Sequence, residues 1–273
     1  RNVLTEYVLL DILPRRVADA HLDGSLHLKD IEDWILKPQS IQHDIRFFLR
    51  TGFDLERSGS NTRTLGPPKD LPAALAVVNS ILSSCAREVS GEQTVPHINV
   101  FLAPFVRGAP EDELRAHLER FLIHLNQLSS DSLISLGLDL TVPSHLQKMG
   151  AIQPEGMVSN MYSDFADEAR RIAQSLMDLL IEDAVHRPVF NPCLIFNVTR
   201  DDLVKGNEDL LNEAHELAAR IGVPVFTNLS PNWQKDVLYD SSGVRLAATW
   251  TGDWELDTMR AGALGTVGIN LPR

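Results

Sequence analysis

The feature that most constrains the fold of this chain is a regular alternation of amphipathic and short apolar segments. Apolar residues recur at steps of three and four over four long stretches, which is the period of a helix with one buried face: 71–89, 110–128, 164–181 and 208–221. Between and after them lie short, nearly continuous apolar segments: 98–102, 133–142, 194–198, 223–227 and 266–271. Such segments are typical of strands buried on both faces. The alternation predicts an α/β fold with helices packed on a parallel or mixed sheet.

Local signals agree with the predicted helices. Pro72 stands in the first turn of the first helix, and Gly91 and Gly222 follow the ends of the first and the last. At His43-Asp44 we expect a helix start, where an aspartate stabilises the N-terminus without any catalytic role. The apolar stripes most plainly face a core, in which we expect these residues to be buried: Leu75, Val78, Leu82, Phe121, Leu125, Leu176, Leu179 and Phe196.

The charge balance limits the partners of this chain. Subtracting 37 Asp and Glu from 25 Lys and Arg gives a net charge of −12, so phosphate backbones and anionic membrane surfaces would be repelled over most of the surface. We therefore expect no nucleic-acid and no membrane partner. There is no signal-peptide organisation and no apolar run near about 18 residues, so we expect a cytoplasmic protein.

The chain shows no composition shift or internal repeat, and we expect one domain over 1–273 with a turn-rich loop at 58–68. It begins at Arg1, its first methionine is Met149, and it stops within an extended apolar segment. We therefore expect a piece of a longer protein.

Residues that could carry metal or thiol chemistry are few. Cys85 and Cys193 cannot form a four-cysteine zinc site or a redox pair of the CxxC type, and we expect two buried thiols in a reducing compartment. His and Asp residues between 19 and 30 could form a metal cluster, but solvated or capping roles in a polar turn are the favoured interpretation: Asp19, His21, Asp23, His27 and Asp30. We expect no metal.

Common nucleotide and nucleophile motifs are absent. The sequence has neither Gly-x-Gly-x-x-Gly nor a Walker phosphate loop, and no Gly-x-Ser-x-Gly nucleophile elbow. Gly262, Gly265 and Gly268 precede a strand end rather than opening a helix, which indicates turn and packing glycines.

Several phrases, in order along nearly the whole chain, carry a family resemblance. The segment Ala20-His21-Leu22-Asp23-Gly24-Ser25-Leu26-His27-Leu28-Lys29-Asp30 resembles the "H-x-G-x-I-H-x-H-D" segment of anaerobic (class III) ribonucleoside-triphosphate reductases. Further phrases resemble later parts of that family in the same order: 67–69, 99–106, 191–196 and 264–273. The resemblance implies half of a ten-stranded α/β barrel, with a finger loop that threads the middle.

The family removes the ribose 2′-hydroxyl of a ribonucleotide by radical chemistry, and this chain departs from it at the radical positions. The family's thiyl cysteine, in a "Met-Gly-Cys-Arg" turn, matches Val244 in Ser242-Gly243-Val244-Arg245. The second cysteine, in an "Asn-Cys" pair, matches Ser40 in Gln39-Ser40. Only sulfur offers a bond to hydrogen weak enough for this chemistry.

The chain departs from the family pattern at other positions as well. Ala263 stands at the family's asparagine, Lys29 at its second histidine, and Gly91-Glu92-Gln93 at its "Gly-Gly-Gln/Thr". The resemblance therefore indicates a scaffold that kept its packing residues and lost its radical residues. The family's glycyl radical, formate reductant and zinc would not be carried by this chain.

Two functions from different classes remain, beside the alternative of a purely structural fragment with no ligand. The first is an anaerobic ribonucleotide reductase homologue that is inactive in this chain. The second is a non-catalytic protein that binds a nucleotide or a partner on the inherited fold. For either we expect a weakened nucleoside triphosphate pocket, in which a turn offers N–H groups and an arginine offers a cation to phosphate: Gln39, Ser40, Ser242, Gly243, Val244 and Arg245. The family also implies a homodimer and a radical-generating activase as partners.

Overall fold

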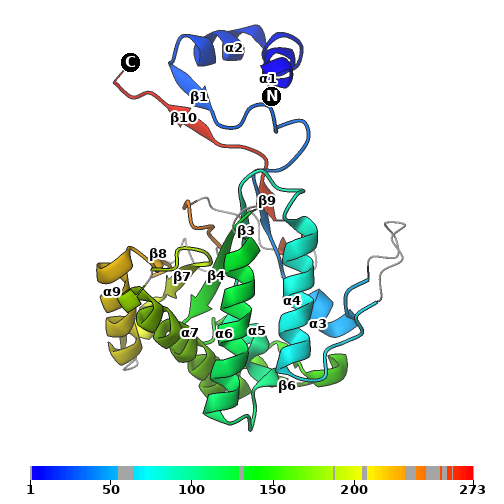
Figure 1. Cartoon of the computed structure of the whole chain (residues 1–273), viewed down its shortest axis with the longest axis vertical. Coiled ribbons are helices and arrows are strands. Elements are labelled where there is room, and N and C mark those ends of the chain that lie inside the picture. The colour runs from blue at the N-terminus through cyan, green and yellow to red at the C-terminus, as the bar shows by residue number, and fades with distance from the viewer. Residues whose placement is uncertain are drawn as a thin grey trace.

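The computed structural model shows a larger body built on a sheet and a smaller lobe above it (Figure 1). It describes residues 2–54, 64–128, 132–186, 188–204, 208–230, 238–243, 253, 257–259 and 261–272. Among these residues no helix is both long and apolar enough to cross a bilayer. Both ends of the chain lie in the smaller lobe.

The larger body contains a curled mixed sheet of six strands in the order β8-β7-β4-β3-β2-β9. Neighbouring strands are parallel except for β9, which runs antiparallel to β2. Apart from β9, the spatial order follows the chain order, as expected for successive strand–helix–strand crossovers. The strands are β2 (Ser40–Gln42), β3 (Glu92–Val95), β4 (Leu133–Asp139), β7 (Cys193–Val198), β8 (Val225–Asn228) and β9 (Gly262–Ala263).

Helices connect the parallel strands and lie side by side in front of the sheet in Figure 1. Between β2 and β3 lie α3 (Arg46–Thr51) and α4 (Leu71–Cys85), and between β3 and β4 lie α5 (Ile98–Leu102), η3 (Ala103–Phe105) and α6 (Glu111–Gln127). The β4–β7 connection holds β5 (Gly150–Ile152), η5 (Pro154–Gly156), β6 (Val158–Met161), η6 (Tyr162–Phe165) and α7 (Ala166–His186). The β7–β8 connection holds α8 (Arg200–Val204) and α9 (Glu208–Ile221).

The four predicted amphipathic helices are confirmed as α4, α6, α7 and α9. At the start of α4, the Asp70 side chain caps the helix by accepting a hydrogen bond of 2.9 Å from the N–H of Ala73. The predicted core is also confirmed, because each of its members is at most 7% exposed: Leu75, Val78, Leu82, Phe121, Leu125, Leu176, Leu179 and Phe196. The expected α/β class, with helices on a mixed sheet, is therefore the observed one.

The prediction of a strand at 98–102 is wrong. These residues form helix α5, which is buried on all sides, and a short apolar run does not distinguish a buried helix from a buried strand. The Asn99 side chain bonds the carbonyls of Asp139 (2.8 Å) and Ala169 (3.1 Å), which satisfies its amide inside the core. The actual strand, β3, was missed because its sequence Glu92-Gln93-Thr94-Val95 is polar.

The prediction of burial on both faces is wrong for the segment 266–271. Strand β10 (Val267–Ile269) pairs with β1 (Leu26–Leu28) in a separate two-stranded sheet in the smaller lobe. Its three residues are exposed, and Ile269 is 74% exposed. The small lobe also contains α1 (Asn2–Tyr7), η1 (Val8–Ile12) and α2 (Arg15–Leu22), and a small core of Val8, Leu28 and Ile31.

The main sheet differs from the expectation in one further respect. Strands β2, β3, β4 and β7 are largely buried, whereas β8 and β9 are half-buried or exposed. In β4 the apolar side chains lie on one face and the polar side chains on the other. Leu136, Leu138 and Phe196 belong to the main core, whereas Ser135 and Asp139, at alternate positions of β4, are buried polar residues.

The core assignment predicts a large effect of truncating α4. Leu82 is fully buried, so Leu82→Ala should lower the free energy of unfolding by about 2–5 kcal/mol, through lost transfer energy and the cavity left behind. Chemical denaturation followed by circular dichroism measures this. The neighbouring exposed Ser83 on the same helix provides the control, since Ser83→Ala should change stability by less than about 0.5 kcal/mol. Equal effects of the two substitutions would contradict the assignment.

Candidate functional site

The side of the main sheet that faces away from α4 carries a contiguous polar surface, which we call the inner face. The opposite side is identified by Gln93, whose amide donates to the carbonyl of Leu82 in α4 at 3.0 Å. Side chains alternate along a strand, and register partners share a face. The polar residues of the inner face are therefore Ser40, Gln42, Glu92, Thr94, Ser135, Asp139, Asn197 and Thr227, and the same register places the apolar Ile195 and Val225 on it.

Glu92 is the centre of the hydrogen bonds on this face. Its carboxylate is 7% exposed and accepts from the hydroxyls of Ser135 on β4 and Thr94 on β3. It also accepts from Ser241, through the backbone N–H at 3.0 Å and the hydroxyl at 2.8 Å. One carboxylate thus fixes two strands and the segment 238–243 to each other.

The segment 240–243 forms a tight turn whose N–H groups are already bonded. Asp240 is 2% exposed, and its carboxylate accepts from the Ser242 N–H at 3.1 Å and the Ser242 hydroxyl at 2.7 Å. The Gly243 N–H donates to the Asp240 carbonyl at 3.1 Å, and Gly243 has a φ of +82°, which glycine adopts without strain. The expectation that Ser242 and Gly243 offer free N–H groups to phosphate is wrong, because Asp240 occupies both donors.

The structure brings four of the expected site residues to one place. Ser40 pairs in register with Glu92 on one side and with Ala263 on the other, and Gln39 donates its N–H to the Ala263 carbonyl at 2.8 Å. A Cβ on Gly262 would lie 2.4 Å from the Ser40 carbonyl oxygen, so only glycine allows β9 this close to β2. The turn that contains Ser242 and Gly243 lies close to this group, because Ser241 bonds Glu92 and Glu92 is in register with Ser40.

Val244 and Arg245, the remaining expected site residues, lie outside the described residues. The structure therefore tests neither the position of the valine that matches the family's thiyl cysteine nor the arginine expected to contact phosphate. Both stay predictions.

Two inner-face side chains have buried polar atoms without a partner. The Ser40 hydroxyl and both amide atoms of Gln42 make no hydrogen bond with the chain as the structure describes it. Ser40 is 3% and Gln42 1% exposed. Gln42 was missed by the sequence analysis, although its alternation with Ser40, and that of Glu92 with Thr94, is a strand pattern with a polar face.

A second polar network lies where β3, β4, β7 and β8 end. His97 bonds the Asp139 carboxylate through Nδ1 at 2.7 Å, and Asn197 donates to the other oxygen of Asp139 at 3.0 Å. The Thr227 hydroxyl donates to the side-chain Oδ1 of Asn197 at 2.8 Å. These bonds link three neighbouring strand ends and residue 97, which follows the fourth, so the network fixes the carboxyl edge of the sheet.

The buried pair Asp44 and Arg46 holds Thr258, near the C-terminal end of the chain, against the main body. Two guanidinium nitrogens of Arg46 bond the carboxylate at 2.5 to 3.1 Å, and the Thr258 hydroxyl also donates to it. Asp44 accepts the N–H of Arg46 at 3.0 Å as well, which confirms its predicted place at a helix start. It also takes part in an ion pair, which the sequence analysis did not foresee.

Among the histidine and aspartate residues between 19 and 30, Asp23 and His21 bond backbone groups of their own segment. Asp23 accepts the N–H of Ser25 at 2.7 Å, and His21 Nδ1 accepts the N–H of Leu28 at 3.1 Å. Over the described ranges, no three His, Cys, Asp or Glu side chains gather as metal ligands would. The turn interpretation of Asp23 is confirmed.

The two cysteines are only partly buried, so the expectation of two fully buried thiols is wrong. Cys85 ends α4, whereas Cys193 begins β7 and pairs in register with Ser135 of the inner face. Burial, with a contribution from the Glu92 charge, raises the pKa of Cys193 to about 11. Burial also raises the pKa of Cys85, with Glu88 adding to it. Both groups are therefore thiols, not thiolates, at neutral pH.

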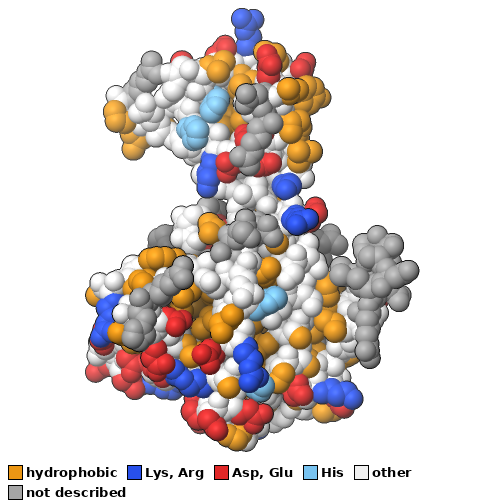
Figure 2. Space-filling model, in the orientation of Figure 1, with side chains coloured by type: hydrophobic (Ala, Val, Ile, Leu, Met, Phe, Trp, Pro, Cys, Tyr) orange, Lys and Arg blue, Asp and Glu red, His pale blue; other side chains and the backbone are white. Residues whose placement is uncertain are grey.

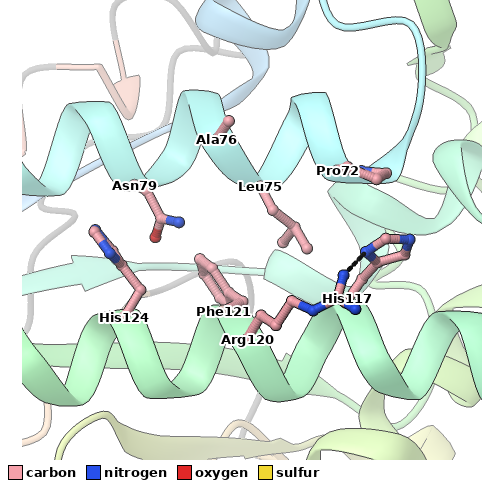
Figure 3. A pocket seen from close by; sticks show the side chains of 8 residues that line it. All are labelled: Pro72, Leu75, Ala76, Asn79, His117, Arg120, Phe121 and His124. Atoms are coloured by element: carbon pink, nitrogen blue, oxygen red, sulfur yellow. Dashed lines mark hydrogen bonds between the residues drawn. The ribbon is translucent and has the colours of Figure 1, made fainter.

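A separate groove of about 340 Å³ lies between α4 and α6, on the helical side of the sheet (Figure 3). His117, Arg120, Phe121 and His124 of α6 face Pro72, Leu75, Ala76 and Asn79 of α4 across it. Histidine and arginine side chains gather over this part of the surface, while acidic side chains are concentrated over α7 and α9 (Figure 2). The groove is not part of the inner face.

Comparison with known proteins assigns the family. The family model of the anaerobic ribonucleoside-triphosphate reductase matches residues 1–273, and the chain belongs to this family. Its curated relatives include the anaerobic ribonucleoside-triphosphate reductases of Haemophilus influenzae, 29% identical over 115 residues, and of Escherichia coli, 30% identical over 109 residues. These matches cover 41% and 39% of this chain but only 16% and 15% of the relatives.

Solved structures agree on the fold. The anaerobic ribonucleotide reductase of Thermotoga maritima with MES in the active site matches 89% of this chain and 43% of its own, with a TM-score of 0.64 and 14% identity. The same enzyme in complex with dATP and CTP matches 80% of this chain and 38% of its own, with a TM-score of 0.61 and 15% identity. This chain therefore has part of the reductase barrel and spans less than half of the solved relatives.

The raised pKa of Cys193 predicts slow alkylation. In a Cys85→Ser variant, iodoacetamide at pH 8 should modify the remaining thiol at least about tenfold more slowly in the folded chain than in guanidinium. The thiolate fraction falls about 100-fold, and the higher nucleophilicity of a high-pKa thiolate offsets only part of this. Mass spectrometry over time gives the two rates. Equal rates would show that Cys193 is an ordinary exposed thiol.

Proposed function

We propose that this chain binds the nucleoside portion of a nucleotide on the inner face and does not reduce it. The observation that carries the proposal is Ser40: a hydroxyl, buried and without a described partner, stands on the inner face where the resemblance places a thiol. Hydrogen-bonding capacity for a ligand is thus retained, while the S–H bond that radical transfer needs is lost.

The positions of the cysteines support the second half of the proposal. Cys193 begins β7, three strands away from Ser40 on β2 in the sheet order, and Cys85 ends the helix α4 on the opposite side of the sheet. Neither cysteine therefore stands where the resemblance places the thiol that Ser40 replaces. The two cysteines also cannot hold the zinc of the family, which uses four, so we assign no step to zinc, glycyl radical or formate.

Gln39, Ser40 and the turn with Ser242 and Gly243 form the proposed nucleoside-binding region. Ser40 supplies the free hydroxyl, and the turn closes over Glu92 next to it. The donors of the turn are occupied, so the proposal does not use them for phosphate. Val244 and Arg245 follow the turn directly and are proposed as its continuation.

The outer surface of α4 supports a homodimer as a second proposal on partners. Over its 15 residues, this helix has no charged side chain, and its exposed positions include the small residues Ala76 and Ser84. Helices with such surfaces can approach each other closely. No described surface of this chain supports the binding of a radical-generating activase, which stays an expectation from the family.

Binding without turnover is the outcome that tests the proposal. We expect cytidine, CTP, adenosine or ATP to bind with dissociation constants no tighter than about 0.1 mM, because few polar groups of the described site are left to bond a ligand. Ligand-observed NMR measures this binding. Ser40→Ala should weaken it several-fold, and Ser83→Ala, a matched change on exposed α4, should not.

The same samples test turnover. With a radical-generating activase and formate present, we expect no deoxynucleotide above the no-enzyme control, with an active member of the family as the positive control. Binding of none of the four ligands, or deoxynucleotide formation by the parent chain, would contradict the proposed function.

A further inference from the structure

The outer edge of strand β10, in the small lobe, is an open and apolar strand edge. More than half of the exposed large apolar side chains of the described chain belong to 2–37 and 264–272, which make up the small lobe and its connection to the larger body (Figures 1 and 2). On β10, Val267 is 50% and Ile269 74% exposed, and Leu271 just after it is 88% exposed. Apolar surface gathered in one place is typical of an interaction site.

The backbone of β10 shows which of its edges is open. Asn270 donates its N–H to the carbonyl of Ser25 at 3.0 Å, next to the ladder between β10 and β1. In an antiparallel ladder every second residue bonds across to the partner strand, so Asn270 and Gly268 face β1. The N–H and C=O groups of Val267 and Ile269 therefore point away from β1, and no partner for them is found among the described residues.

The other edge of this two-stranded sheet is covered from within the chain. The N–H of Leu28 on β1 points away from β10 and donates to Nδ1 of His21 on α2 at 3.1 Å. In the described part of the chain β10 has no such cover, and two short strands alone are only marginally stable in water. A further strand beside β10 would supply the bonds that this small sheet lacks.

The absence of charge on β10 favours a second copy of this chain as the occupant. Edge strands of natural proteins carry charged residues that prevent pairing, yet the segment 261–272 contains none. In a contact across a two-fold axis, each residue near the axis meets the same residue of the other copy, so a charge there would face its own like. Because the whole chain has a net charge of −12, two copies approach with the least repulsion at an uncharged segment.

The strand also fits its own copy in register. With the two-fold axis at Gly268, Val267 of one copy lies opposite Ile269 of the other, and the two residues exchange the N–H and C=O groups that point away from β1. Valine and isoleucine are apolar and β-branched, which suits cross-strand neighbours. This register therefore uses the open backbone groups of both residues and brings apolar side chains together.

We propose that two copies of this chain associate through their β10 strands, antiparallel and across a two-fold axis at Gly268. The product is one sheet of four strands in the order β1-β10-β10-β1. The contact is separate from the one proposed for α4, which lies in the larger body. Three residues on each side bury less than the about 1,200–2,000 Å² of a stable complex, so the dimer is weak and reversible.

A cysteine on the two-fold axis tests the contact directly. In a chain whose Cys85 and Cys193 are replaced by serine, Gly268→Cys places two thiols opposite each other, with Cα atoms about 4.5 Å apart, within the range of a disulfide. The position has room, because a Cβ there would meet nothing closer than 3.7 Å. With oxidised glutathione as the oxidant, a non-reducing gel should show at least about fivefold more linked dimer than for the exposed control Asn270→Cys, which has no cysteine opposite it.

Sedimentation equilibrium gives an independent measurement without an added cysteine. The average mass of the parent should rise from that of one chain towards that of two between about 10 and 500 µM, as expected for a small contact. Ile269→Lys should weaken association at least about tenfold, because it places a charge beside the axis in each copy. The control Val185→Lys changes another exposed apolar residue, at the end of α7, and should associate as the parent does.

Two results would overturn the inference. One is equal linking of Gly268→Cys and Asn270→Cys, and the other is a parent chain whose association Ile269→Lys leaves unchanged. A dimer formed through α4 alone would give both results, as would a chain that stays monomeric at every concentration. Neither result bears on ligand binding by the inner face, which the NMR titration tests separately.

Discussion

The buried carboxylate of Glu92 is the interaction on which the arrangement of the inner face depends. It lies at the first residue of β3, bonds to Ser135 on β4, and receives both the N–H and the hydroxyl of Ser241. A buried carboxylate is stable only if its oxygens are bonded, and Ser241 supplies two of those bonds from a segment 149 residues away in the sequence. The position of the turn 240–243 next to Ser40 follows from this requirement.

The sequence predicted the helices and the main core well and the inner face poorly. The stripes of α4, α6, α7 and α9 are strong because each helix has one apolar face, and Leu82 and Leu176 are buried as that pattern requires. Strand β3 was not predicted because Glu92 and Thr94 are polar residues on a buried face. Whether a polar side chain is buried depends on the tertiary structure. Helix α5 was predicted as a strand because its apolar run is as short as a typical strand.

The candidate site was found by resemblance more than by residue pattern. The resemblance matched both Ser40 and Ala263 to functional positions of the family, and β2–β9 pairing places them in register. The occupied donors of the turn could not be predicted, since they depend on how Asp240 folds back on its own segment. Gln42 was also missed, because a glutamine in a sequence gives no sign that its amide will be buried without a partner.

The chain belongs to the anaerobic ribonucleoside-triphosphate reductase family and has part of its barrel fold, and its inner face carries hydroxyl, amide and carboxylate groups. A fold does not fix the chemistry of the groups that it presents, because packing maintains the core independently of them. The hydroxyl of Ser40 and the amide of Gln42 are hydrogen-bonding groups, and neither can transfer a hydrogen atom as a thiol does.

Amide hydrogen exchange of Ser241 tests most directly whether Glu92 holds the turn on the inner face. In a Glu92→Ala chain, the Ser241 amide should lose its protection, while amides of α6 keep theirs because that helix packs in the main core. A Glu119→Ala chain, which removes an exposed carboxylate from α6, should leave both regions unchanged. Unaltered protection of Ser241 in Glu92→Ala would contradict the account.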